Sequence, residues 1–208
     1  MATTQAALTP TTQTAPAVIS IAAKELSGGH WVSRFPGSKH VSDLRPSFQL
    51  AVSDFVWAIE QAGATVKVNA TYRPAERAYL MHWSWRIVNE SYNAANVPSM
   101  AGVLIEWEHP TAELSKKAAK DMVAAYGMST LKTRPATDSL HIRREAIDMN
   151  VSWTGALKIK LKDGSETEIT STPRDGMNLH LKEVGATYGV IKFKGGSTDR
   201  PHWSTTGR

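Results

Sequence analysis

Four residues in the second half of the chain are of the types that build a hydrolytic metal site. His141 and Asp148 lie seven positions apart, and Asp199 and His202 follow much later, three positions apart. Two imidazoles and one carboxylate, from His141, Asp148 and His202, are a ligand set that proteins use for Zn²⁺. Asp199 supplies a second carboxylate close to the last imidazole.

Three protein ligands leave the fourth position of a tetrahedral zinc ion to a water molecule. The cation lowers the pKa of that water from about 15.7 to roughly 7, which gives a hydroxide nucleophile near neutral pH. Hydrolysis also needs a proton acceptor. Asp199 is spaced for this role, because Pro201 stiffens the short link to His202 and can hold the carboxylate over the water.

Composition narrows the possible ligands and partners. The 208 residues include no cysteine, which excludes disulfides, thiolate ligands and thiol nucleophiles, so a metal must be bound by histidine and carboxylate. The net charge of +5 favours anionic partners such as nucleic acid, acidic membrane or acidic wall polymer. Because the basic residues are scattered and do not alternate with aromatic residues, we expect no nucleic-acid partner.

The N-terminal residues predict an arm and no export address. Residues 1–24 are rich in Thr, Ala, Gln and Pro, and we expect a flexible arm there, followed by a single domain over residues 25–208. No positive segment precedes the short apolar stretch 17–23, so the pattern of a secretory signal is missing. No run approaches the ~20 apolar residues of a membrane span. We expect synthesis in the cytoplasm and no membrane insertion.

Hydrophobic spacing predicts the elements that must position the four residues. Helices are expected over residues 46–62, 75–88 and 111–126, with a short one over 177–184 that Gly185 closes. Strands are expected over 66–70, 146–153 and 188–194, with a hairpin over 157–170. Helices early in the chain and antiparallel strands later indicate an α+β domain.

The predicted strands and loops determine where each candidate metal ligand lies. A spacing of seven excludes one helix face for His141 and Asp148, since such neighbours are three or four residues apart. With His141 on a loop that enters strand 146–153, both side chains reach one edge of the sheet. His202 then arrives from the last loop.

The motifs resemble those of a known enzyme family. S-x-H ending at His141, A-x-D ending at Asp148 and D-x-x-H-W ending at Trp203 are similar to the pattern of the zinc D-Ala-D-Ala carboxypeptidases and L-alanyl-D-glutamate endopeptidases. That family includes vancomycin-resistance D,D-peptidases and phage endolysins. Tyr72-Arg73-Pro74 matches its Y-R-[SP] element, and residues 185–189 match its G-x-x-[WY]-G segment.

The resemblance implies a fold and a set of roles. The fold would be D,D-peptidase or hedgehog-like, an antiparallel sheet that carries one zinc ion, with helices packed on one side. His141, Asp148 and His202 would bind the zinc, and Asp199 would be the general base. Arg73 would bind the substrate carbonyl or carboxylate and stabilise the oxyanion, although an arginine at a corner could equally pair with a carboxylate for structure.

Three further residues receive implied roles. Ser139 would support its loop or touch substrate, and Trp203 would pack beside His202 as a wall. Where this chain has Arg144, the family often has glycine, which can serve a backbone angle that other residues reach only with strain. Either the loop geometry differs here, or Arg144 has a substrate-facing role.

The implied activity is a zinc metallopeptidase that hydrolyses stem-peptide or cross-link amide bonds of bacterial peptidoglycan. It would be a cell-wall lytic endopeptidase or a D,D-carboxypeptidase, such as a phage lysin or a secreted antibacterial effector. We expect a monomer. Because the pattern of an export signal is missing, the protein would reach the periplasm or the wall through lysis, a holin or a contractile secretion apparatus. That apparatus and an immunity protein are candidate partners. Two alternatives remain: a zinc-stabilised wall-binding module without turnover, and a basic nucleic-acid binder.

Overall fold

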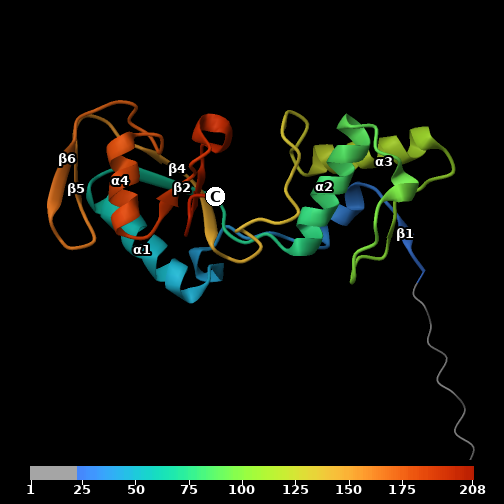
Figure 1. Ribbon diagram of the computed structural model, residues 1–208, viewed down its shortest axis with the longest axis horizontal. Helices are drawn as coiled ribbons and strands as arrows, with labels where there is room; N and C mark the ends of the chain where they lie inside the picture. Colours follow the sequence, from blue (N-terminus) through green and yellow to red (C-terminus); the bar gives the residue numbers. More distant parts are fainter. Residues whose placement is uncertain (1–22) are drawn as a thin grey trace, which may run out of the picture.

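The computed structural model describes residues 23–208, so the arm predicted over residues 1–24 lies, except for its last two residues, outside the described part. The protein is mixed α+β with an antiparallel central sheet, which confirms the α+β class and the antiparallel sheet of the prediction. Figure 1 shows two lobes, one around the sheet and one around a pair of helices. The α-helices of the described residues are α1 (Pro46–Gln61), α2 (Ala75–Asn89), α3 (Ala112–Ala125) and α4 (Leu179–Thr187).

The central sheet has the strand order β2-β4-β8-β7, and all neighbouring strands are antiparallel. Its strands are β2 (Thr65–Ala70), β4 (Ala146–Ser152), β8 (His202–Ser204) and β7 (Ile191–Lys192). A separate hairpin joins β5 (Leu157–Lys160) to β6 (Glu166–Ile169), as predicted. Because β8 lies between β4 and β7, a segment from the end of the sequence is inserted into the middle of the sheet.

The two faces of the sheet differ in character. Successive residues of a strand point to opposite faces, so Ile147 and Met149 turn to one side, and Trp203 joins them because it pairs with Ile147. All three are buried in a hydrophobic core shared with α1 and α4. Asp148 and His202, which pair with each other, consequently turn to the opposite face.

Helix α1 forms because its sequence suits both its start and its buried face. Pro46 occupies the first helical turn, where the missing N–H is not needed. Phe48, Val52, Phe55 and Ile59 recur every three or four residues and are fully or almost fully buried against the sheet. Each such side chain stabilises the fold by about 1.5–3 kcal/mol.

Helix α4 differs from the prediction. The Asn178 side chain caps it, so it begins two residues later than expected. The prediction that Gly185 closes the helix is wrong, because α4 continues to Thr187. A Cβ at Gly185 would lie 2.8 Å from an indole carbon of Trp203 and 2.8 Å from the carbonyl oxygen of Val190. Gly185 therefore permits the close approach of Trp203.

The last strands also differ from the prediction. The strand expected over residues 188–194 is reduced to Ile191–Lys192, after a turn at Gly189 with a φ of +78°. His202 was expected on a loop, but it is the first residue of β8. A strand of three residues is too short to show the alternation by which strands are recognised.

The second lobe has its own hydrophobic core. Helices α2 and α3 pack against each other there, together with a short parallel pair of strands, β1 (Glu25–Leu26) and β3 (Ile105–Glu106). Thr111 caps α3 as predicted, accepting a hydrogen bond from the backbone N–H of Leu114 at 3.2 Å. Within residues 23–208, no helix is both long and apolar enough to cross a bilayer.

Candidate metal centre

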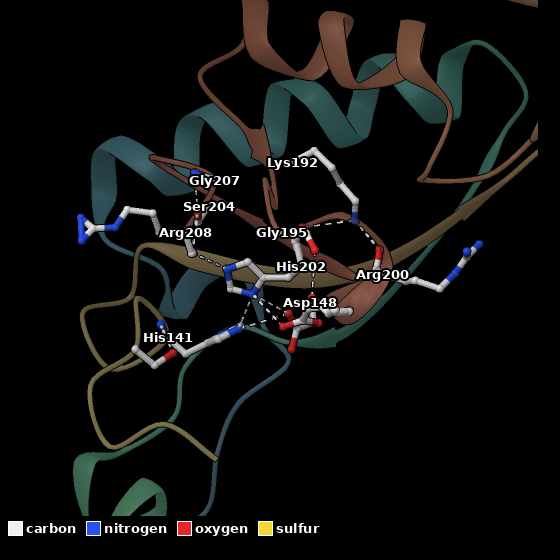
Figure 2. A network of polar contacts seen from close by, with 12 residues as sticks. His141, Asp148, Lys192, Gly195, Arg200, His202, Ser204, Gly207 and Arg208 are labelled. Atoms are coloured by element: carbon white, nitrogen blue, oxygen red, sulfur yellow. Dashed lines mark hydrogen bonds and ion pairs between the residues drawn. The ribbon is translucent and has the colours of Figure 1, made fainter. Parts of the chain in front are cut away.

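Three side chains from two separate segments of the chain converge on one point (Figure 2). The ligand atoms of His141, Asp148 and His202 all lie within 4.8 Å of one another. His141 Nε2 is 3.2 Å from Asp148 Oδ1 and 3.3 Å from His202 Nδ1, and the latter two atoms are 3.1 Å apart. The structure thus brings together the three predicted ligands in a largely buried cluster that could hold a metal ion.

The elements that carry the three ligands are short and tightly connected. Asp148 and His202 face each other across the β4–β8 pair. His141 lies in the turn before β4, where the backbone N–H of Arg144 donates to the His141 carbonyl oxygen at 3.2 Å and that of Glu145 to the Leu140 carbonyl oxygen at 2.9 Å. This turn folds the His141 ring back over the strand that it enters.

Each imidazole is oriented by a main-chain oxygen on its outer side. His141 Nδ1 lies 2.9 Å from the carbonyl oxygen of Thr71, and His202 Nε2 lies 2.9 Å from the main-chain oxygen of Arg208. These oxygens only accept hydrogen bonds, so each outer nitrogen carries a proton and donates it. In the neutral rings, the inner nitrogens then direct lone pairs into the cluster, as metal-binding histidines do.

The charges in the cluster favour a cation. Burial acts to raise the pKa of Asp148, but hydrogen bonds and positive charge from His141 and His202 outweigh it and hold this pKa well below its usual range. Burial acts to lower the pKa of His202, yet the bond and charge of Asp148 raise it. Metal binding requires both imidazoles to be neutral. Two nitrogen lone pairs and the ionised carboxylate then face one another, and a bound cation would relieve their repulsion. This donor set fits Zn²⁺.

Asp199 lies beside the cluster without joining it. Its Oδ2 is 3.9 Å from His202 Nδ1, and its side chain is 48% exposed. Burial and the nearby charge of Asp148 both raise the pKa of Asp199 above its ordinary value. A carboxylate of raised pKa that solvent can reach is suited to accept a proton from water during catalysis.

Arg73 lies at the corner between β2 and α2. Its backbone N–H donates to the carbonyl oxygen of His141 at 3.3 Å, so the corner is fixed to the ligand turn. Burial lowers the pKa of its guanidinium, an effect that Asp148 opposes. Within the described residues the guanidinium has no hydrogen-bond or ion-pair partner, so the alternative of a structural pair with a carboxylate finds no support. Arg73 lines the cleft beside the metal cluster and can bind an anion there.

Ser139 and Trp203 occupy different surroundings. Ser139 Oγ accepts a hydrogen bond from the backbone N–H of His141 at 3.3 Å, which supports the loop, and Ser139 also lines the cleft. Trp203 is fully buried on the core face of the sheet, with its ring centre 5.5 Å from that of Phe55. It therefore supports His202 from behind the strand.

Arg144 has the backbone conformation for which glycine is favoured. Its φ is +62°, so the loop keeps a left-handed residue at this position without glycine. The guanidinium lies 4.2 Å from the centre of the Tyr72 ring and 3.4 Å from the carbonyl oxygen of Asp43. Because Arg144 does not line either hollow beside the metal cluster, a substrate-facing role finds no support in this geometry.

The cluster opens into a cleft of about 480 Å³ between the two lobes. One wall comes from the sheet lobe and includes Phe193, and the other comes from residues 131–136 and from Met81 of α2. A second hollow of about 240 Å³ shares Ser139, Phe193, Asp199 and His202 with the first. The two hollows therefore adjoin beside the metal cluster, and together they are called the groove.

The wall over residues 131–136 was missed by the sequence analysis. Two buried side chains of α2 hold it: His82 Nδ1 lies 2.7 Å from the carbonyl oxygen of Pro135, and Trp85 Nε1 donates to that of Leu131 at 3.1 Å. The segment has no periodic pattern, and its partners are about fifty residues away. No local signal in the sequence could therefore have placed it at the site.

The chain matches no known family model and no curated protein.

Proposed function

We propose that this protein is a zinc-dependent peptidase that hydrolyses amide bonds in the stem peptides or cross-links of bacterial peptidoglycan. The observation that carries the proposal is the convergence of His141, Asp148 and His202, with both outer ring nitrogens hydrogen-bonded to main-chain oxygens. The substrate class comes from the motif resemblance, and the charges along the groove are compatible with it.

The residues in and around the cluster have different roles in the proposed hydrolysis. A zinc ion held by the three ligands would supply the Lewis acid that activates water near neutral pH. Asp199 accepts the proton that the attacking water loses, and it can donate that proton to the departing amine nitrogen. Arg73 binds the carbonyl oxygen of the scissile bond and stabilises the charge that develops on it.

The groove favours an acidic peptide that is cut within its length. Arg73 and Arg134 line the larger hollow, and Arg143 and Arg208 line the smaller one. Arg134 and Arg143 are already ion-paired with Glu90 and Asp138, so Arg73 and Arg208 are the guanidinium groups that substrate carboxylates would meet. A carboxypeptidase needs a closed pocket for the substrate terminus. The open groove therefore supports an endopeptidase.

Digestion of purified peptidoglycan tests the proposal. Zinc-loaded protein should release fragments that mass spectrometry can identify, a chelator should abolish the release, and added zinc should restore it. Stem peptides freed from their cross-links, or cut internally, would identify an endopeptidase, whereas free D-alanine would identify a carboxypeptidase. Absence of any product from zinc-loaded, folded protein would rule out the peptidase proposal.

A further inference from the structure

A lysine is buried next to the metal cluster, and neither the ligand set nor the proposed chemistry uses it. Lys192 on β7 is only 4% exposed, and among the lysines and arginines of the described residues it alone is buried. Removing an ammonium group from water is costly unless its hydrogen bonds are replaced. Its partners therefore indicate what it does.

The ammonium group of Lys192 is satisfied by the backbone of the turn that carries the site. It donates to the carbonyl oxygens of Arg200 and His202, the latter at 3.2 Å from Nζ (Figure 2). It also lies 4.8 Å from the centre of the Trp203 ring. Two carbonyl oxygens and one aromatic face engage the three N–H donors of the group. No ion pair with a carboxylate is found for it in residues 23–208.

The two carbonyl groups that Lys192 binds belong to Arg200 and His202, the residues on either side of Pro201. They lie in the turn that connects Asp199 to His202. Pro201 has no N–H with which to close the turn, although its carbonyl oxygen accepts from the backbone N–H of Met149 at 2.9 Å. The carbonyl oxygen of His202 also accepts from the backbone N–H of Phe193 at 3.1 Å. For the carbonyl oxygen of Arg200, the one donor found in the described residues is Lys192.

We propose that Lys192 is a positioning residue of the metal centre, which fixes the turn 199–202 and thereby places both the His202 ring and the Asp199 carboxylate. Loss of the ammonium leaves the Arg200 carbonyl without its donor, so the part of the turn before Pro201, which carries Asp199, loses its link to β7. The effect on His202 concerns metal binding alone, whereas the effect on Asp199 rests on the proposed function.

A purely structural role for Lys192 makes different predictions. A lysine that only stabilises the fold would lower the unfolding temperature when replaced, but it would leave the coordination of a bound metal unchanged in the folded protein. A positioning residue changes the coordination itself. The spectrum of bound Co²⁺ reports the geometry of a zinc site and distinguishes the two roles.

The test compares Lys192→Met, which keeps the length of the side chain but removes its donors, with Lys192→Arg, which restores donors. Lys194→Met, an exposed site two residues away, is the matched control. We expect Lys192→Met to bind Co²⁺ about 10–100-fold more weakly, the usual effect of losing a group that supports a metal ligand. Its Co²⁺ absorption bands should shift, Lys192→Arg should recover part of both changes, and the control should match the wild type.

Folded Lys192→Met protein with wild-type Co²⁺ affinity and spectrum would overturn the inference. If Lys192→Met does not fold, Lys192→Gln gives the same comparison, because its shorter side chain cannot reach both carbonyls. Wild-type protein that bound no Co²⁺ would overturn the metal centre and this inference together. Wild-type protein that bound Co²⁺ but released nothing from peptidoglycan would overturn only the peptidase proposal.

Discussion

Asp148 and His202 face each other across neighbouring antiparallel strands, with Oδ1 and Nδ1 3.1 Å apart. The next pair along, Ile147 and Trp203, points into the hydrophobic core. The register of the β4–β8 pair thus determines both which residues enter the core and where two of the three candidate ligands lie. A slip of one residue would exchange the faces, so the large apolar surface of Trp203 stabilises the placement of the metal ligands.

The Asp148 carboxylate should be required for metal binding. Asp148→Asn keeps the shape of the side chain but removes the negative charge that balances a dication. Loss of a group that only supports a ligand already weakens metal binding by about 10–100-fold, so we expect zinc affinity to fall by more than about 100-fold when a ligand is lost. Isothermal titration with zinc measures the change. Asp121→Asn, an exposed aspartate on α3 in the other lobe, is the control. Undiminished affinity in Asp148→Asn would exclude Asp148 as a ligand.

Asp199 should be dispensable for zinc and essential for turnover. Asp199→Ala removes the proposed proton acceptor without touching the three ligands, so we expect the rate of wall digestion to fall by about 10²–10⁴-fold, with zinc content unchanged. Fragment release and metal analysis on the same preparation measure both. If wild-type protein binds zinc and peptidoglycan but digests nothing, the wall-binding module becomes the better account.

The sequence predicted the parts of the site that depend on local patterns. Helix α1, strand β4 and the turn around His141 follow from periodicity, a first-turn proline and residue types within a few positions. The three candidate ligands were also chosen correctly as a cluster, because spacing and residue type limit where histidine and aspartate can meet.

The remaining features depend on contacts between residues that are far apart in the chain. Strand β8 exists because three residues insert between β4 and β7, and the wall over residues 131–136 is held by side chains of α2. Gly185 gave a stop signal for α4, but its lack of a side chain serves the packing of Trp203. Burial of Lys192 was equally invisible, since a lysine in a short sequence window indicates exposure.

The buried His82 should make the stability of the protein depend on pH. Burial lowers the pKa of His82, an effect that outweighs its hydrogen bond to the Pro135 carbonyl oxygen. The unfolded chain then binds the proton more readily, so stability is full above the unfolded pKa of about 6.5 and is lost as pH falls through the lower folded value. Unfolding by urea at several pH values should show that the free energy of unfolding falls less at acid pH in His82→Gln than in the wild type.

His180 provides the control for this measurement, because it is exposed on α4. His180→Gln should retain the pH slope of the wild type between about pH 7 and pH 5, the range around the ordinary histidine pKa. Equal slopes in His82→Gln and the wild type would show that another group accounts for the acid loss.

Gly185 should tolerate no side chain. In Gly185→Ala the new methyl group would meet Trp203 and the Val190 carbonyl oxygen, both at 2.8 Å, and we expect a loss of about 1–3 kcal/mol in the free energy of unfolding. Gly176→Ala is a matched control, because its new methyl group would meet the same indole at an ordinary 3.8 Å. Equal stabilities for the two variants would mean that the core adjusts around Trp203 without cost.

Arg144 should contribute to stability and not to the site. Its left-handed backbone costs about 1–2 kcal/mol for a residue other than glycine, whereas its guanidinium gains about 0.5–1 kcal/mol over the exposed face of an aromatic ring. Arg144→Ala keeps the strain and loses the contact with Tyr72, so it should lower stability by about 0.5–1 kcal/mol. Arg144→Gly loses the contact but relieves the strain, and it should be at least as stable as Arg144→Ala.

Denaturant unfolding measures the order of stability of the Arg144 variants, and zinc affinity should be the same in both variants. A loss of wall digestion in both, with stability and zinc binding intact, would instead place Arg144 on the substrate.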